Sequence, residues 1–441
     1  MRTMTRRRLL IAGAATAIAP TQLFCTPLPH GKEFSASQLD SIGAATSKAA
    51  SSGDVPGAIS VVWQEGEIRC THRAGVRDVE TRLPMESSTL MGIASMSKPV
   101  TVAVAMMLIE QGRMKLDDPI TRWAPEFGNM RVLRRPDGPL DDSYLAARAI
   151  TIEDLMTHRS GLSYSFLSQG PLAGALFSKF GMGIESAMSP DAWMRAMAAL
   201  PLAYAPGERF NYGHSIDVLG FVIARAAGSN LRQLMREQLF DPLGMKDTDF
   251  WIPPEKRARA ARVYFSPAPS HFMAVTLNGF NGDAPPAYTS GGQGLISTAN
   301  DYLKFSRLLL HNGAVDGKRL LQPDSVKRMT EDHLTPTQRQ FPAFMDEKYW
   351  DRWGCGLGMT IVRNPALAGS SAAAGAFGWG GAFGGWWQAD PTHKSILLWL
   401  QSCLPAPPAP GVPLSPRVPG AAGVFELQRN AYAALNAAHS S

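Results

Sequence analysis

Residues 95–112 read SMSKPVTVAVAMMLIEQG, and this stretch decides how the rest of the sequence is interpreted. It opens on Ser95 and Lys98, three positions apart, and continues as an almost wholly apolar run. A helix that is apolar on nearly every side is buried between two layers of structure. Pro99 fits the first turn of such a helix, because proline is tolerated there and breaks later turns. The stretch therefore predicts a buried helix with Ser95 and Lys98 at its start.

Ser95 and Lys98 also have the residue types and the spacing of a nucleophile and its activating partner. A serine hydroxyl is a weak nucleophile at neutral pH and needs a base within hydrogen-bonding reach. Positions i and i+3 lie on one helix face, so the Lys98 amine can point at the Ser95 hydroxyl. Lys98 could accept the proton itself if it is held neutral, or its charge could make a nearby tyrosine the base. Because Ser-x-x-Lys also arises by chance, its meaning depends on the rest of the chain.

The sequence on either side of this helix predicts an α+β fold with two lobes. An Ala-rich helix pattern comes first, followed by two paired strands; three more strand patterns and a closing helix come near the end. These segments are residues 35–51, 58–63, 68–74, 357–362, 376–389, 395–401 and 424–435. An antiparallel sheet built from both ends of the chain and flanked by helices is therefore expected.

Between those ends the chain has helical patterns, such as residues 152–157 and 216–227, separated by loops rich in Pro and Gly. We expect a single catalytic domain over residues 26–441. Its α/β lobe takes in about 35–114 and 336–441, and a mostly helical lobe of about 115–335 is inserted between the first and the last strands. A cleft between the two lobes is the natural place for a ligand. The Pro-rich residues 404–419 predict a surface loop.

Charge and cysteine usage exclude two classes of partner. The formal charge of +6 includes four arginines in the first eight residues, and the remaining 39 Lys and Arg nearly balance 37 Asp and Glu. That balance leaves no basic surface for nucleic acid. The four cysteines have no Cys-x-x-Cys pair and no neighbouring His at ligand spacing, so no metal site is expected. Cys70, Cys355 and Cys403 are interpreted as free thiols, although export would permit a disulfide among them.

The first 25 residues predict an export signal. Arg6, Arg7 and Arg8 precede the short apolar stretch 11–19, which is too short to span a membrane. The paired arginines resemble the twin-arginine pattern of bacterial export, and a generic secretory signal is the alternative. Gln22 and Phe24 argue against lipid attachment at Cys25, so no stable membrane anchor is expected. The predicted location is the bacterial periplasm or the extracellular space.

Several motifs, in order along the chain, resemble the serine β-lactamase and penicillin-binding-protein superfamily, and most closely the class C β-lactamases and family VIII carboxylesterases. No Gly-x-Ser-x-Gly elbow, His-Glu-x-x-His or P-loop pattern is present to support another hydrolase class. The matching segments are Ser95-Met96-Ser97-Lys98-Pro99-Val100, Leu155-Met156-Thr157-His158-Arg159-Ser160-Gly161-Leu162, Pro206-Gly207-Glu208-Arg209-Phe210-Asn211-Tyr212, Gly291-Gly292-Gln293-Gly294-Leu295-Ile296-Ser297-Thr298 and Gly378-Trp379-Gly380-Gly381. They extend over nearly the whole chain after the leader and imply a β-lactamase/transpeptidase-like fold.

The resemblance also implies roles for individual residues. Ser95 is the nucleophile, Lys98 its partner and Tyr212 the general acid/base. The backbone N–H groups of Ser95 and Ala382 form the oxyanion hole, although a slip of one residue would move the second donor. Gly380 and Gly381 belong to the substrate-binding motif with Trp379. His158 falls in a structural segment.

Two departures from the β-lactamase pattern favour esters over β-lactams. The family's Tyr-x-Asn is Tyr212-Gly213-His214 here, which loses the amide that contacts a β-lactam side chain. Its Lys-Thr-Gly is Trp379-Gly380-Gly381, which loses a cation for the drug carboxylate and adds an aromatic wall, the form found in family VIII esterases. His214 and Trp379 are therefore expected to contact substrate, with the core as the alternative place for either ring.

The sequence thus predicts a serine hydrolase that cleaves small carboxylic esters through an acyl-enzyme on Ser95, without a cofactor or a metal. The alternatives within the enzyme class are a weak β-lactamase, a D-amino-acid peptidase or amidase, and an acyltransferase. A ligand-binding relative without turnover is a further alternative. The expected partner is a small ester substrate; the oligomeric state, the acyl-chain preference and the physiological substrate are left open.

Overall fold

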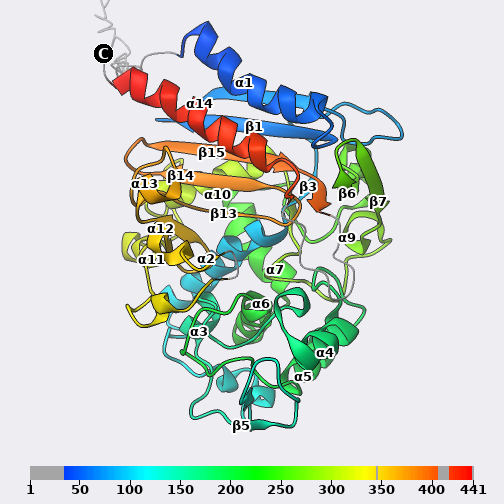
Figure 1. Cartoon of the computed structure of the whole chain (residues 1–441), viewed down its shortest axis with the longest axis vertical. Coiled ribbons are helices and arrows are strands. Elements are labelled where there is room, and N and C mark those ends of the chain that lie inside the picture. Colours follow the sequence, from blue (N-terminus) through cyan, green and yellow to red (C-terminus); the bar gives the residue numbers. More distant parts are fainter. Residues whose placement is uncertain (1–33, 344–345, 406–416, 440–441) are drawn as a thin grey trace, which may run out of the picture.

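The computed structural model describes residues 34–343, 346–405 and 417–439, and a seven-stranded antiparallel sheet forms the centre of one lobe (Figure 1). The strand order is β11-β12-β13-β14-β15-β1-β2, so strands from both ends of the chain lie side by side. The strands are β1 (Gly57–Gln64), β2 (Glu67–Gly75), β11 (Trp353–Cys355), β12 (Thr360–Val362), β13 (Phe377–Gly380), β14 (Trp386–Asp390) and β15 (Ser395–Gln401). This arrangement confirms the predicted sheet built from both ends.

The middle of the sheet is buried on both faces. Every residue of β1 and of β15 is buried, and the two strands pair from Ala58 opposite Gln401 to Gln64 opposite Ser395. Such strands are continuous apolar runs because neither face meets water. β2 forms an edge of the sheet and alternates between exposed and partly buried residues over much of its length.

Two helices from opposite ends of the chain cover one face of the sheet. α1 (Ala36–Ser51) begins at Ser35, whose hydroxyl forms a capping box with Gln38, and it packs against α14 (Ala421–His439). Figure 1 shows the two helices crossing the same face of the sheet. Their apolar sides, for example Ile42 and Leu427, share a core with Trp399 of β15.

The other face of the sheet carries the helix predicted from residues 95–112. The chain enters it through a 3₁₀ turn, η1 (Ala94–Met96), and continues as α2 (Ser97–Glu110). Residues 97–108 of α2 are all buried, as expected for a helix between two layers. α10 (Ala299–Leu310) lies against β14 and β15 on this side of the sheet.

The second lobe consists mainly of helices, to which the structure adds short strands that the sequence pattern did not predict. The helices are α3 (Ile152–Met156), α4 (Gly170–Phe180), α5 (Pro190–Ala198), α6 (Ser215–Ala227), α7 (Leu231–Met235), α8 (Asp241–Leu243), α9 (Asn278–Asn281) and α11 (Pro323–Met329). Two further short helices, α12 (Tyr349–Arg352) and α13 (Pro365–Ala368), lie beside the large sheet (Figure 1). The short turns are η2 (Ile120–Arg122), η3 (Pro125–Phe127), η4 (Ser165–Leu167), η5 (Arg236–Phe240), η6 (Pro254–Arg259) and η7 (Gln338–Gln340). The strands are β3 (Met91–Gly92), β4 (Arg131–Leu133), β5 (Ser143–Leu145), β6 (Val263–Ala268), β7 (His271–Val275), β8 (Ile296–Ser297), β9 (Ala314–Val315), β10 (Lys318–Arg319) and β16 (Cys403–Pro405).

The largest of these additions is a three-stranded sheet of β16, β6 and β7. β6 pairs with β16, which comes from the far end of the chain, in the parallel direction. Pairing between segments so distant in sequence leaves no local turn signal, which is why the sequence pattern missed it.

The predicted leader and most of the Pro-rich loop lie outside the described residues. Cys70, Cys355 and Cys403 are free thiols, which confirms the interpretation of these three residues. Over the described ranges, no helix has the length and apolar character needed to cross a membrane.

Candidate active site

Ser95 lies in the 3₁₀ turn η1, at the point where the chain enters α2. It is buried, with 7% of the residue exposed. The preceding Ala94 has a φ of +43°, a left-handed conformation that costs energy in a residue with a side chain. This bend lies against Gly381, where an added Cβ would be 2.3 Å from the Ile93 carbonyl oxygen. The nucleophile is therefore held between α2 and the end of β13.

Two donors converge on the Ser95 hydroxyl oxygen. Lys98 Nζ donates to Ser95 Oγ over 2.9 Å, and the Tyr212 hydroxyl donates to the same oxygen over 2.9 Å. Lys98 is fully buried, and its Nζ also donates to the Gly292 carbonyl oxygen at 2.9 Å. The structure thus brings together the three residues that the sequence analysis singled out as nucleophile, partner and acid/base.

Tyr212 is held by close backbone packing and by aromatic rings. An added Cβ at Gly213 would be 2.4 Å from the Leu162 carbonyl oxygen, so only glycine allows this approach. The ring centroids of Tyr164 and Trp379 lie 5.5 and 5.7 Å from that of Tyr212. Lys98 Nζ is 4.7 Å from the Tyr212 ring centroid, where a cation is attracted to the ring face. The phenol therefore has one fixed position beside the nucleophile.

His158 packs against Tyr212 with a ring centroid distance of 4.7 Å, yet neither of its ring nitrogens has a hydrogen-bond partner within the described residues. Burial, and secondly the charge of Lys98, hold the pKa of His158 well below 6.5. Its imidazole is therefore neutral at pH 7. The His158 ring forms no hydrogen bond with Ser95, which agrees with a structural role for this residue.

His214 lies beneath the site rather than at an accessible wall. The residue is only 1% exposed and forms the N-cap of α6. Its Nδ1 pairs with Asp217 Oδ2 at 2.8 Å, and Tyr164 and Trp193 pack against its ring. A ring so enclosed reaches a substrate only through its neighbours, so the expected direct contact between His214 and substrate finds no support in this geometry.

The motif around Trp379 lies at the end of β13. Trp379 pairs with Trp387 of β14 and is partly buried beside Tyr212. The chain then turns, with the Gly384 amide donating to the Gly381 carbonyl oxygen at 2.8 Å. Ala382 is exposed in this turn, and in the described part of the chain its amide donates to no backbone carbonyl. Gly381 passes close to the nucleophile's turn, since an added Cβ there would be 3.6 Å from the Ala94 Cβ, and Ala382 is the next residue.

Asp217 is a residue that the sequence analysis did not select. It is fully buried in the first turn of α6 and accepts hydrogen bonds from the Ser290 hydroxyl at 2.5 Å and from the Gly292 amide at 3.0 Å. The signal that could have found it is its position as the only charged residue in the apolar run from Ser215 to Ala224.

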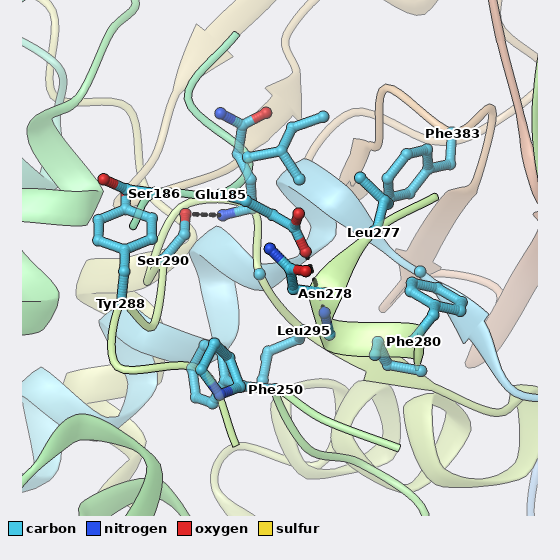
Figure 2. A pocket seen from close by; sticks show the side chains of 17 residues that line it. Glu185, Ser186, Phe250, Leu277, Asn278, Phe280, Tyr288, Ser290, Leu295 and Phe383 are labelled. Atoms are coloured by element: carbon cyan, nitrogen blue, oxygen red, sulfur yellow. Dashed lines mark hydrogen bonds between the residues drawn. The ribbon is translucent and has the colours of Figure 1, made fainter. Parts of the chain in front are cut away.

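Two cavities lie beyond the segment that contains Gly292. The smaller, of about 40 Å³, is drawn in Figure 2, where apolar side chains such as Phe250 and Phe383 face the polar groups of Glu185 and Ser290. The larger, of about 420 Å³, adjoins it through shared lining residues and is mainly apolar. Its walls include Met182, Ile184, Phe265, Val275, Leu277, Phe383 and Leu404. Ser95, Lys98 and Tyr212 line neither cavity, but Phe383 follows Ala382 directly.

No group of three or more His, Cys, Asp or Glu side chains suited to a metal ion occurs among the residues described.

Comparison with known proteins gives the same family at three levels. The family model described as Beta-lactamase matches residues 39–412. An uncharacterized protein of Mycobacterium tuberculosis is 42% identical over 370 residues, which cover 83% of this chain and 90% of that protein. Esterase EstB of Burkholderia gladioli is 31% identical over 78% of this chain and 85% of its own. The solved structure of a simvastatin synthase mutant from Aspergillus terreus superimposes with a TM-score of 0.74 at 26% identity, covering 91% of this chain and 96% of the other.

Proposed function

The chain belongs to the beta-lactamase family, whose members include esterases and acyltransferases, and from this premise we propose that it is a carboxylesterase acting through an acyl-enzyme on Ser95. The substrate class is small carboxylic esters. The observation that carries the proposal is the convergence of Lys98 Nζ and the Tyr212 hydroxyl on Ser95 Oγ, each at 2.9 Å.

Acylation begins from the phenolate form of Tyr212: Ser95 Oγ attacks the ester carbonyl, and its proton passes to the phenolate oxygen, which regains the hydroxyl seen in the structure. The ammonium of Lys98 lies 4.7 Å from the phenol ring centroid and favours negative charge on the phenol oxygen, so that Tyr212 can accept the proton. The negative oxygen of the tetrahedral intermediate is bound by the backbone N–H groups of Ser95 and Ala382. Collapse of the intermediate breaks the ester C–O bond, and the alcohol leaves with the proton from Tyr212.

Deacylation repeats the same transfers with water in place of the alcohol. Water attacks the acyl carbon, Tyr212 takes its proton, and the proton returns to Ser95 Oγ when the carboxylic acid leaves. Because every proton moves between Ser95, Tyr212 and the substrate, the cycle needs no cofactor.

Preference for esters over β-lactams is supported by what surrounds the site. Trp379 stands where a cation would pair with a drug carboxylate, and it lies next to Tyr212. A mainly apolar cavity of about 420 Å³ has Phe383 in its wall, directly after Ala382 in the chain, and has the size and lining for an uncharged acyl or alcohol group. An ester without negative charge needs no cation to bind there.

Acyl transfer to an alcohol other than water is the second candidate, and the specific observation in its favour is the likeness to proteins named acyltransferases. One is an acyltransferase of Monascus pilosus, 30% identical over 76% of this chain. The chemistry at Ser95 is the same for both, and only the acceptor in deacylation differs.

The deciding experiment compares p-nitrophenyl butyrate with a chromogenic cephalosporin on wild type, Ser95→Ala and Tyr212→Phe. We expect wild type to prefer the ester. Ser95→Ala should lose about 10⁴-fold or more in kcat, as for removal of a nucleophile, and Tyr212→Phe about 10²- to 10³-fold. Dominant cephalosporin turnover would contradict the esterase assignment. Absence of Ser95-dependent labelling by a fluorophosphonate would contradict the enzyme assignment as a whole.

We also propose that the protein is exported, because Arg6, Arg7 and Arg8 precede a short apolar stretch. Cell fractionation tests this: the proposal expects the full-length chain in the periplasm or the medium, and a variant with Lys at Arg6 and Arg7 retained in the cytoplasm. Wild type retained in the cytoplasm would refute it.

A further inference from the structure

The segment Gly291–Leu295 is fastened along one side of α2, and it completes the surroundings of Lys98. Thr101 Oγ1 donates to the Gly291 carbonyl oxygen at 2.6 Å, and Lys98 Nζ donates to the Gly292 carbonyl oxygen at 2.9 Å. The Leu295 amide donates to Ser97 Oγ at 3.1 Å. The Gly292 carbonyl therefore fixes the direction of one N–H of the Lys98 ammonium. It also fixes the direction of the remaining N–H groups, one of which donates to Ser95.

Asp217 holds the same segment from the opposite side. Its Oδ1 accepts from the Gly292 amide at 3.0 Å and from the Ser290 hydroxyl, while its Oδ2 pairs with His214 Nδ1. An ionised carboxylate only accepts hydrogen bonds, so His214 carries the proton on Nδ1. Asp217 and Lys98 thus bind the N–H and the C=O of one residue, Gly292.

The carboxylate of Asp217 is charged despite its burial. Burial alone would raise the pKa of Asp217, but the hydrogen bond and charge of His214, the charge of Lys98 and the Ser290 hydroxyl outweigh it and hold that pKa below 3.8. Lys98 faces it from α2 and His214 from the start of its own helix. Tyr164 and Tyr288 face it from two loops, and burial together with the Asp217 charge raises the pKa of both phenols well above 10. Lys98 and Asp217 are thus a cation and an anion buried together.

We propose that Asp217 is a positioning residue for the acylation of Ser95, which holds the Gly292 carbonyl in place and, through it, the Lys98 amine directed at Ser95 Oγ. The inference rests on the acyl-enzyme chemistry proposed above. Removing one partner from a buried set of charges is strongly destabilising for the charge that remains, so loss of the carboxylate is expected to loosen Lys98 as well as Gly292.

The test is Asp217→Asn, which keeps the shape and an acceptor for Gly292 but removes the charge. We expect kcat for p-nitrophenyl butyrate to fall about 30- to 300-fold with KM nearly unchanged, because the interaction acts on the transition state. The acid limb that protonation of the Asp217 carboxylate gives to the pH–rate profile should be lost, because the amide of asparagine does not titrate. Asp217→Glu should recover part of the activity.

Asp390→Asn is the matched control, because Asp390 is another fully buried aspartate paired with a histidine, away from Ser95. It should leave kcat and the pH–rate profile of the folded protein unchanged. If kcat of Asp217→Asn stays within about threefold of wild type and its pH–rate profile is unchanged, the inference is overturned. If wild type itself shows no Ser95-dependent hydrolysis, the proposed function has failed instead.

If Asp217→Asn fails to fold, a comparison of Ser290→Ala with Thr101→Val tests the inference instead. Ser290→Ala removes a donor from the carboxylate, so Asp217 takes up a proton more easily and the acid limb of the profile should move to higher pH. Thr101→Val removes a neighbouring fastening of the same segment without touching the carboxylate, and its acid limb should stay in place. An unmoved acid limb in Ser290→Ala overturns the inference.

Discussion

In the described part of the chain, two pairs of histidine and aspartate with a fully buried carboxylate look alike and have different roles. His214 Nδ1 lies 2.8 Å from Asp217 Oδ2 at the start of α6, and His393 Nδ1 lies 2.9 Å from Asp390 Oδ2 between β14 and β15. In both pairs the residues are three positions apart and the carboxylate is fully buried. The pair alone therefore does not distinguish the two regions.

The difference lies in the third partner. Asp390 accepts from the backbone amides of Ala373, Thr392 and His393, and His393 Nε2 contacts Asn436 of α14. That pair fastens a loop and a helix to the sheet. Asp217 instead reaches Gly292 and, through it, the lysine beside the nucleophile. Whether a buried charge is structural or functional is thus decided by what its remaining lone pairs bind.

The largest expected effect comes from removing the cation beside the nucleophile, Lys98. Lys98→Met should lower kcat for p-nitrophenyl butyrate by about 10³-fold or more, because Ser95 loses its donor and Tyr212 its neighbouring charge. Lys394→Met is the control: Lys394 follows His393, forms an exposed ion pair with Glu65 and should be silent. Activity of Lys98→Met within tenfold of wild type would show that the cation is dispensable.

The second prediction removes the aspartate of the other pair, Asp390 and His393, which has the structural role. Asp390→Ala leaves three backbone amides and His393 Nδ1 without their acceptor, and should lower the free energy of unfolding in urea by about 3 kcal/mol or more. The kcat of the protein that remains folded should match wild type. A lower kcat at unchanged stability would mean that the two pairs are not distinct.

His158 sharpens the comparison because it is a buried histidine without any hydrogen-bond partner in the described chain. Its pKa is held well below 6.5 by burial and by Lys98, so the unfolded chain binds a proton more readily than the folded one. Its contribution to stability is full above about pH 6.5 and is lost as pH falls below that value. His158→Asn, which suits the φ of +54°, should show a smaller fall in Tm from pH 8 to pH 5 than wild type. Exposed His271→Asn should keep the wild-type fall; an equal fall in His158→Asn would contradict the assignment.

His333 should show the opposite and smallest effect. Burial alone would lower the pKa of His333, but Glu153 and the Arg328 carbonyl outweigh it and raise that pKa above 6.5. Its contribution is therefore full below about pH 6.5 and is lost as pH rises through the higher folded value. His333→Gln should cost up to about 1 kcal/mol at pH 5 and less at pH 9, measured by urea unfolding. A larger cost at pH 9 would reverse the sign and refute it.

The parts of the site that depend on local spacing could be predicted from the sequence. Ser95 and Lys98 lie on one helical turn, and the motif order led to Tyr212. Contacts through main-chain atoms could not be predicted in this way. Gly292 was part of a quoted motif, but the contact that its backbone carbonyl makes does not depend on residue type and so leaves no mark in the sequence. His214 was expected to contact substrate because it lies two residues after Tyr212 in the motif, with the core as the alternative, and only the fold shows its buried pairing with Asp217.

The same limit applies to the fold. Helices and hairpins with clear periodicity, such as residues 35–51 and 58–74, lie within a residue or two of their predicted positions. The predicted strand over residues 376–389 is two strands, β13 and β14, because Gly381, Gly384 and Gly385 form a turn between them. β3, β8 and β16 are too short to show the alternating pattern of a strand. Each forms only because it pairs with a strand that is distant in the sequence.

The pairing of β1 with β15 has a consequence for how the protein is made. β1 leaves the ribosome early but cannot complete its place in the sheet until β15 and α14 have been synthesised. Closing so large a loop makes folding slow and leaves apolar strands such as β1 open to aggregation in the meantime. A nascent chain that lacks its last fifty residues has no β15 to join β14 to β1, so the turn at Gly381 has no finished sheet behind it to hold Ser95 in place.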